Sequence, residues 1–392
     1  MHNRDNDLKN QNAEENNKKS FVILVGPRTP PVTGLAMVSE WLIAKINRKN
    51  IDVCISDITV KPTKIRILYI LKRIYSHLRS AIKLVQNATK PNKNLLIHVN
   101  GDFGIIFSAG ISLVGRVLSY QLFLYHHSSR YVRGPSFLAR MLMAISGKQA
   151  WHLLAADSMA QDMARRYENA RHFLVIDNSA FVAPTAAQPR MLRQPPTLGF
   201  LSNLAVGKGV DTTLDLLRAL HRRAPGPWRL VMAGRTLDAQ TDALVKAAAV
   251  EFGSALDLRG PVWADQKDAF FQDIDILIFP TSYKHETQSL VVPEALSHAI
   301  PVLAYDHAYV GTLLASGGGR VFPPGEEFLH GAVEQIIAWS ADPDSYGDAS
   351  SRALAHFLAA HAEGQRQVLA LEQRLGETRQ APVPEGENGK RG

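Results

Sequence analysis

Two glutamates near residue 290 have a residue type and a spacing suited to ligand binding. Glu286 and Glu294 are separated by seven residues, and Glu294 follows a proline in the segment Pro293-Glu294-Ala295-Leu296. Proline is preset for the first helical position, so the sequence predicts a helix that begins at Pro293. A carboxylate in the first turn can accept hydrogen bonds from the vicinal hydroxyls of a ribose, and the helix N-terminus offers N–H groups to a diphosphate. With Glu286 on a second sugar, the pair describes a site for a nucleotide sugar.

Short apolar runs on both sides of this segment predict the elements that position it. Residues 274–279 precede the loop that carries Glu286, and residues 301–304 follow the predicted helix. Both runs have the length and β-branched content of buried strands. Open parallel sheets bind ligands at the carboxyl ends of their strands, which is where Glu286 and Glu294 would then lie.

The glutamate pair and the segment EALSHAIPVLA that continues it resemble the E-x7-E signature of the retaining glycosyltransferases of family four. The resemblance extends over about residues 20–375. It implies an α/β protein of GT-B fold, with two Rossmann-like doubly wound domains that face a central cleft. It also implies transfer of a sugar, with retention of configuration, from a UDP- or GDP-linked donor to a glycan or polyprenyl-diphosphate-linked acceptor. By analogy with that family, the resemblance implies a role in the synthesis of the bacterial envelope, lipopolysaccharide or exopolysaccharide.

A lysine between two glycines, Gly207-Lys208-Gly209, follows the apolar run 197–201 and is suited to hold a diphosphate as a point charge. It matches the KG pair of the resembling family. Five residues earlier that family often has arginine, where this chain has Asn203. Either Asn203 contributes a neutral hydrogen bond, or Arg235 supplies the missing charge. The resemblance implies that Lys208 and the amides near Glu294 stabilise the departing diphosphate.

The resemblance also implies further contacts to the donor. Residues 287–289 are Thr-Gln-Ser where many members have Gly-Phe-Gly, and Ala299 stands where the family usually has glycine after the helix. Alanine tolerates a left-handed turn poorly, so the turn is expected to differ. The donor-binding residues implied in addition to Glu294, Asn203, Gly207, Lys208 and Arg235 are Thr287, Gln288, Ser289, Leu290, Val291 and Val262.

In the first half of the chain, a Gly/Pro-rich loop and a histidine pair follow predicted strands. The loop 26–34, which contains Gly26, Pro27, Thr33 and Gly34, resembles the glycine-rich loop that lines the family's cleft. It lacks the G-x-G-x-x-G pattern of dehydrogenases. The segment LYHHSSRYV resembles the segment whose histidine contacts the donor sugar, and the sequence does not choose between His126 and His127. Glu286 and one of these histidines would hold the sugar.

Length and composition suggest two domains in a reducing compartment. The chain has 392 residues, one cysteine (Cys54) and no apolar segment near its start. We expect a disordered polar tail at 1–20, an acceptor-side domain at 21–180, a linker at 181–196 and a nucleotide-sugar domain at 197–345. A helix over 346–375 would cross back to the first domain, and 376–392 would be a second disordered tail.

The stretch 61–83 predicts a basic amphipathic helix with apolar residues on one face: Ile67, Ile70, Leu71, Ile74 and Leu78. Such a helix suits an anionic membrane surface, or it is a core helix with a solvated basic back. The net charge of +8 favours anionic partners. We expect no nucleic-acid partner and a cytoplasmic protein, which in the first of these two alternatives associates peripherally with the inner membrane face.

Other chemistries account less well for the pattern. Asp273-Ile274-Asp275 is a literal D-x-D, but it leads into a strand instead of following one, so we expect a structural role, no required metal and no cofactor. A nucleotide-sugar epimerase of GT-B architecture and a non-catalytic sugar-nucleotide-binding protein remain alternatives. A glycoside hydrolase also uses two carboxylates, but its substrate has no diphosphate for the lysine and the helix N-terminus to bind.

Overall fold

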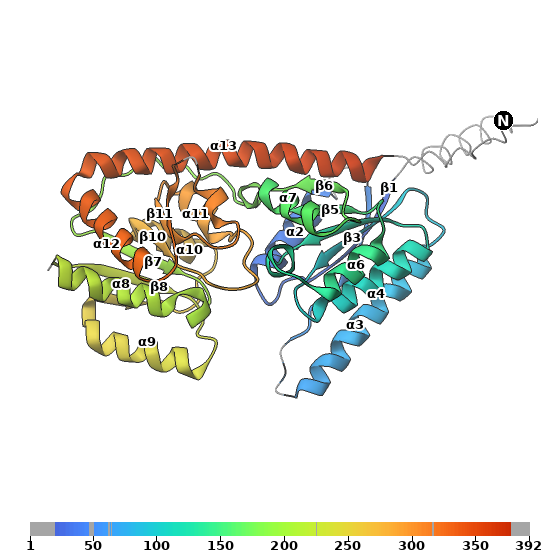
Figure 1. Ribbon diagram of the computed structural model, residues 1–392, viewed down its shortest axis with the longest axis horizontal. Coiled ribbons are helices and arrows are strands. Elements are labelled where there is room, and N and C mark those ends of the chain that lie inside the picture. The colour runs from blue at the N-terminus through green and yellow to red at the C-terminus, as the bar shows by residue number, and fades with distance from the viewer. Residues whose placement is uncertain are drawn as a thin grey trace, which may run out of the picture.

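The computed structural model describes residues 20–46, 51–61, 63, 65–224, 226–315 and 317–377. They form two six-stranded parallel sheets with helices packed around them, and one long helix runs along both (Figure 1). Except for residues 20, 376 and 377, the two tails predicted at 1–20 and 376–392 lie outside the described residues.

The first sheet has the strand order β2-β1-β3-β4-β5-β6. Its strands are β1 (Ser20–Gly26), β2 (Ile51–Asp57), β3 (Lys93–Val99), β4 (Gln121–His126), β5 (Trp151–Leu154) and β6 (His172–Val175). The connecting helices are α2 (Gly34–Ile46), α3 (Arg66–Gln86), α4 (Gly104–Val117), α5 (Arg130–Arg133), α6 (Phe137–Ser146) and α7 (Asp157–Arg166), and the 3-10 helix η1 (Asn178–Phe181) follows β6.

The second sheet has the order β12-β11-β10-β7-β8-β9. Its strands are β7 (Thr197–Leu201), β8 (Arg229–Ala233), β9 (Leu256–Leu258), β10 (Ile276–Phe279), β11 (Val302–Tyr305) and β12 (Gly319–Phe322). The helices are α8 (Val210–Arg223), α9 (Ala239–Phe252), α10 (Asp265–Asp273), α11 (Val291–Ser297) and α12 (Glu326–Ala341), with 3-10 turns η2 (Val206–Lys208), η3 (Gly253–Ala255) and η4 (Val310–Leu313).

Both sheets are buried on two faces. Strand β1 is buried along all seven residues, SFVILVG, and β7 and β10 are buried throughout. Continuous apolar runs of this kind are typical of parallel strands that are covered by helices on both faces. The strand order reverses between β1 and β3 in the first sheet and between β7 and β10 in the second. Ligands of doubly wound sheets bind at such switch points.

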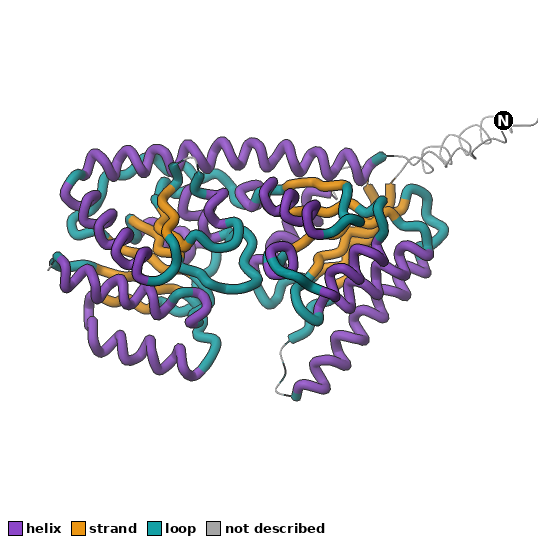
Figure 2. The backbone as a smooth tube through the Cα atoms, in the orientation of Figure 1, coloured by secondary structure: helices purple, strands orange, loops and turns teal. Residues whose placement is uncertain are grey.

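Helix α13 (Pro343–Gly376) ties the two sheets together, as Figure 2 shows along the top of the molecule. Its first half packs on α11 and α12, and its second half packs on η1, β6 and β1. Gly364 allows the closest approach, since a Cβ there would lie 2.8 Å from the Cβ of Ala180. The long helix therefore contacts elements of both domains.

The segment after Glu286 differs in detail from the prediction. Helix α11 begins at Val291, so Pro293 occupies the third helical position instead of the first. Ala299 adopts φ 59° and is fully buried, so alanine here takes the left-handed turn for which glycine is usual.

Helix α3 presents its apolar stripe to solvent. Ile67 is 70% exposed and Leu78 57%, whereas Ser76, His77, Ser80 and Leu84 are the buried residues of the helix. The alternative prediction, a core helix with a solvated basic back, is therefore wrong. No helix among the described residues combines the length and the apolarity that crossing a bilayer requires.

Candidate active site

The loops that follow β7 and β10 bring together the two side chains predicted to hold the diphosphate and the sugar. The Nζ atom of Lys208 donates a hydrogen bond of 2.7 Å to Oε2 of Glu286 and lies 4.2 Å from the ring centroid of Tyr283. Both charged side chains are mostly buried, with 21% and 11% of their surfaces exposed. A cation and a carboxylate from opposite sides of the switch point thus form the centre of the site.

Gly209 is required for this arrangement. Its φ is +89°, in the left-handed region that favours glycine. A Cβ on it would lie 2.4 Å from the carbonyl oxygen of Pro280, the residue that follows β10. The glycine therefore lets the lysine loop touch the glutamate loop, and the backbone N–H of Ser282 donates to the carbonyl of Gly207 at 3.1 Å.

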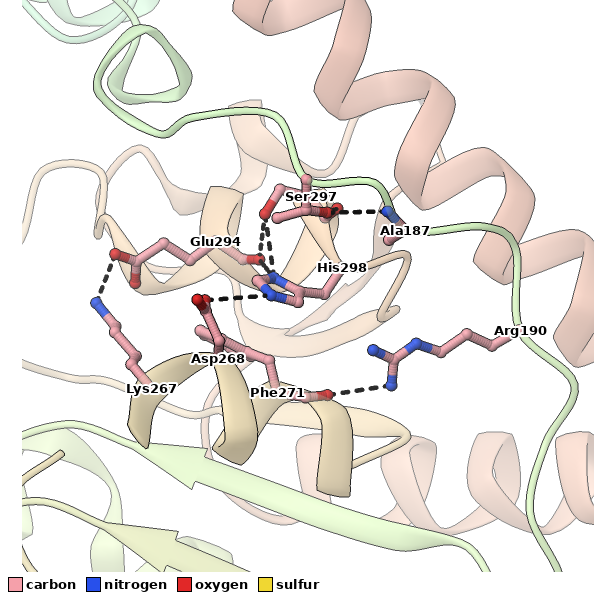
Figure 3. A network of polar contacts seen from close by, with 9 residues as sticks. Ala187, Arg190, Lys267, Asp268, Phe271, Glu294, Ser297 and His298 are labelled. Atoms are coloured by element: carbon pink, nitrogen blue, oxygen red, sulfur yellow. Dashed lines mark hydrogen bonds and ion pairs between the residues drawn. The ribbon is translucent and has the colours of Figure 1, made fainter. Parts of the chain in front are cut away.

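Glu294 lies in the first turn of α11, beside Lys267 of α10 (Figure 3). Lys267 Nζ donates to Glu294 Oε1 at 2.5 Å, and burial raises the pKa of the Glu294 carboxyl although Lys267 opposes this. Its Oε2 atom is buried without a hydrogen-bond partner among the described residues. An acceptor of this kind is unfavourable unless a ligand donates to it.

A network around His298 anchors the helix that carries Glu294 (Figure 3). His298 Nδ1 lies 2.8 Å from the carbonyl oxygen of Glu294, and its Nε2 lies 3.6 Å from Asp268 of α10. Arg190 donates to the carbonyls of Phe271 and Ile274 at 3.1 and 3.0 Å. The contact of His298 with Asp268 joins the end of α11 to α10, and Arg190 ties α10 to the segment between the two domains.

The other residues of the lysine loop are exposed. Asn203, Gly207 and Arg235 all have exposed surfaces, and Arg235 has no ion-pair partner among the described residues. The backbone N–H of Leu204 donates to the carbonyl of Arg235 at 2.9 Å, so Arg235 lies on the loop next to Asn203. Arg235 therefore places a cation next to the position where arginine was expected.

Gln288, predicted to contact the donor, uses its side-chain amide in hydrogen bonds within the protein. Its side chain is 3% exposed. Its Oε1 atom accepts from the backbone N–H of Asn178 at 3.1 Å, and its Nε2 atom donates to Asp177 at 3.1 Å and to Thr312 at 2.8 Å. These partners, two of them in the first domain, occupy its amide. Contact of Gln288 with the donor stays a prediction.

The neighbours of Gln288 lie between the two sheets. Thr287 is buried, whereas Ser289, Leu290 and Val291 are partly exposed. Leu290 packs against the cores of both domains, and a Cβ on Gly34 would lie 3.7 Å from its Cδ1 atom. Val262 is buried in the second core.

The predicted loop at residues 26–34 faces this segment from the first domain. Gly26 is the last residue of β1, and Pro27 follows it. Thr33 caps α2, because its Oγ1 atom accepts from the N–H of Ala36 at 3.1 Å. Gly34 begins that helix and is the loop residue next to Leu290.

The two candidate histidines differ in their surroundings. His126 is 1% exposed, and its ring nitrogens lie 2.8 Å from Tyr131 Oη and 2.9 Å from His152 Nδ1. His127 is partly exposed, and its Nε2 atom lies 2.8 Å from Nδ1 of His98. No described residue is within hydrogen-bond reach of its Nδ1 atom. Burial lowers the pKa of both rings far below the usual value, so both are neutral near pH 7.

A polar cluster that the sequence did not predict as a unit joins the two domains beside Glu286. His285 Nε2 lies 3.0 Å from Asp102, and His285 Nδ1 lies 2.8 Å from Ser128 Oγ. Arg130 donates to the same carboxylate, and Lys284 Nζ lies 3.6 Å from it. Asp102 follows β3 and Arg130 follows β4, so the carboxyl-end rule could have found them. Their partners after β10 could not be identified without the fold.

The two D-x-D aspartates have separate structural partners. Asp273 pairs with Arg259 at 2.7 Å. Asp275 accepts from Arg193 at 2.7 Å and from the backbone N–H of Thr197 at 2.8 Å. Within the described ranges, no three histidine, cysteine or acidic side chains are grouped as metal ligands.

Comparison with known proteins identifies the architecture. Residues 195–342 match the family model described as glycosyl transferases group 1. HepE from Anabaena, solved with UDP-glucose, superposes with a TM-score of 0.61 at 17% identity over 92% of this chain and 99% of that one. A glycosyltransferase from Rickettsia africae gives 0.62 at 12% identity, over 91% of this chain and 98% of that one.

A third similar structure is longer than this chain. TarM superposes with a TM-score of 0.62 at 13% identity over 77% of this chain, and the chain spans 58% of TarM. No curated protein matches the chain in sequence. The two sheets and these likenesses confirm the predicted fold: the chain has the GT-B architecture of two Rossmann-like domains. The match over residues 195–342 relates the second sheet and its helices to glycosyl transferases of group 1.

Proposed function

We propose that this protein transfers a sugar, with retention of configuration, from a nucleotide-diphosphate sugar to a glycan or a polyprenyl-diphosphate-linked acceptor. The observation that carries the proposal is the group of Lys208, Glu286 and the unpaired carboxylate oxygen of Glu294 at the switch point of the second sheet. The lysine suits the diphosphate of a nucleoside diphosphate, and the unpaired oxygen of Glu294 suits its ribose hydroxyls. The proposed setting is bacterial surface polysaccharide synthesis.

In this proposal the diphosphate takes the place of Glu286 on Lys208. The lysine then stabilises the negative charge that develops on the leaving diphosphate, which is preorganised electrostatic catalysis. Glu286 turns to the hydroxyls of the transferred sugar, and Glu294 Oε2 accepts from the ribose. His127, the partly exposed histidine, contacts the sugar from the first domain and His126 does not. Arg235 supplies the second charge for the diphosphate.

UDP is the first nucleotide to test. HepE was solved with UDP and with UDP-glucose, and a variant of TarM from S. aureus was solved with Fondaparinux, α-GlcNAc-glycerol and UDP. GDP is the alternative nucleotide. The acceptor is a carbohydrate or a lipid-linked oligosaccharide in both cases.

Thermal melting with UDP, GDP and ADP tests the site. A ligand at one hundred times its dissociation constant adds about 2.7 kcal/mol of stability, and each kcal/mol raises the midpoint of a domain of this size by about 2–4 °C. We expect a rise with one base, lost in Glu294→Gln and kept in Glu334→Gln, whose side chain is 45% exposed on α12. No rise with any nucleotide would contradict the proposal.

The reaction products separate transfer from its alternatives. An epimerase would convert the donor sugar without an acceptor, and a non-catalytic binder would leave the donor intact. The exposed Asn203 at an expected arginine position is the observation that favours mere binding. The transferase is expected to hydrolyse the donor slowly in the absence of acceptor, releasing first the anomer that retains the donor's configuration, which proton NMR detects.

The proposal includes a site of action at a membrane. Helix α3 exposes Ile67, Ile70, Leu71, Ile74 and Leu78 in a stripe, next to the exposed Arg66, Lys72 and Arg79. Apolar side chains beside basic ones match the acyl boundary and the anionic headgroups of a bilayer. A protein docked in this way on the inner membrane face would meet a lipid-linked acceptor there.

A further inference from the structure

The ring of His127 ends a short chain of buried polar side chains. His98, in β3, is 1% exposed, and its Nδ1 atom lies 2.8 Å from Nε2 of His127. The two rings are nearly parallel, with an angle of 7° and centroids 4.9 Å apart. The other nitrogen of His98, Nε2, lies 3.3 Å from Oγ of Ser39 on α2, which is completely buried. The chain thus runs from the interior to the partly exposed histidine.

Gly26 leaves the space that the side chains of His98 and Ser39 occupy. A Cβ on Gly26 would lie 2.6 Å from Cδ2 of His98 and 3.1 Å from Oγ of Ser39. Any larger residue at the end of β1 would displace the His98 ring. A glycine of the predicted cleft loop therefore supports the histidine pair as well.

The number of protons on each side chain determines which group donates in the hydrogen bonds from Ser39 to His127. Burial lowers the pKa of His98 to about 3, and that of His127 is also far below its usual value, so each ring carries one N–H proton near pH 7. The hydroxyl of Ser39 has no hydrogen-bond partner other than His98 among the described residues. If Ser39 accepted from His98, its own buried proton would lack an acceptor, which is unfavourable. Ser39 is therefore the donor to His98 Nε2.

We infer that Ser39 and His98 hold His127 in the tautomer protonated at Nδ1 and so position it as a hydrogen-bond donor to the donor sugar. His98 Nε2 accepts from Ser39, so the proton of His98 is on Nδ1 and is donated to His127 Nε2. The proton of His127 must then be on Nδ1, the nitrogen that no described residue occupies. His98 and Ser39 are positioning residues. The inference rests on the proposed function, in which His127 contacts the sugar.

A second histidine pair on the same sheet provides a matched control. His152 Nδ1 lies 2.9 Å from Nε2 of His126, and both rings are buried. The Nε2 atom of His152 has no partner among the described residues. The two pairs are similar in bond length, but only the pair formed by His98 and His127 ends at a partly exposed ring. Loss of either bond should affect packing similarly.

The tautomer is measurable without any substrate. In protein labelled with ¹⁵N-histidine, the His127 signals are assigned by their loss in His127→Gln. Long-range ¹H–¹⁵N couplings then show which nitrogen is protonated. We expect Nδ1–H in the unchanged protein. In Ser39→Ala we expect a mixture of tautomers, because this change removes the hydroxyl that donates to His98 Nε2 with little change in volume. A proton on Nε2 of His127 in the unchanged protein would overturn the inference.

Turnover of the donor tests the positioning role. We expect His98→Leu to lower kcat/KM by about tenfold, as loss of one oriented hydrogen bond does. His98→Asn, whose amide can donate from nearly the same position, should recover most of the activity, and His152→Leu should keep it. Equal losses in His98→Leu and His152→Leu would reduce the effect to packing and overturn the inference. If the unchanged protein protonates Nδ1 but turns over no donor, the proposed function fails and the tautomer assignment stands.

Discussion

At the scale of single residues, Lys208 carries the most specific expectation. Its ammonium group is paired with the mostly buried Glu286, so removal of the lysine also leaves a carboxylate without its cation. We predict that Lys208→Ala weakens UDP binding by about tenfold to a hundredfold, the range for a hydrogen bond to a charged group. Titration calorimetry measures this directly. Lys246→Ala, an exposed lysine on α9 with the same loss of charge, should bind UDP as the unchanged protein does.

Unchanged UDP affinity in Lys208→Ala would remove the lysine from the diphosphate site. The sequence predicted Lys208, Glu286 and Glu294 because their spacing within each loop is local. It did not predict the pairing of Lys208 with Glu286, since 78 residues separate them and only the neighbouring positions of β7 and β10 bring them together. Nor did it predict the bond between Gln288 and Asn178, which lie 110 residues apart.

At the scale of secondary-structure elements, α3 predicts membrane binding. We expect the protein to co-sediment with anionic vesicles at low salt and to release as salt screens its basic residues. Replacement of Ile67, Leu71 and Leu78 by serine should abolish co-sedimentation, because these exposed side chains supply the apolar contact. Val250→Ser, an 88% exposed valine on α9, removes apolar surface elsewhere and should have no effect.

Equal co-sedimentation of the triple variant would show that α3 is not the contact surface. Periodicity alone predicted the apolar stripe on this helix, but not whether the protein covers it. The stripe is exposed because the opposite face of α3 packs on the protein. There Ser80 bonds Ser56 of β2 at 2.8 Å, and His77 stacks on Phe107 of α4. Small polar residues let that face pack closely, and the larger apolar residues remain outside.

At the scale of the whole molecule, the two domains meet through polar contacts at several points. Gln288 bonds Asn178, and His285 bonds Ser128 and Asp102. Helix α13 adds packing against both domains. Interfaces of this polarity are typical of domains that move relative to one another. Composition predicted that there are two domains, but the contacts between them depend on side chains from distant segments.

The junction at Gln288 can be separated experimentally from the donor site. Gln288→Ala leaves the buried N–H of Asn178 and its neighbours without their partners, which costs about 1–3 kcal/mol. We therefore predict a melting midpoint several degrees lower, with UDP affinity within about threefold of the unchanged protein by calorimetry. Gln161→Ala, at an exposed glutamine of α7, controls for loss of an amide and should change neither quantity. If Gln288→Ala instead keeps its midpoint and loses UDP affinity, the side chain contacts the donor, and the domains are held together by the remaining contacts and by α13.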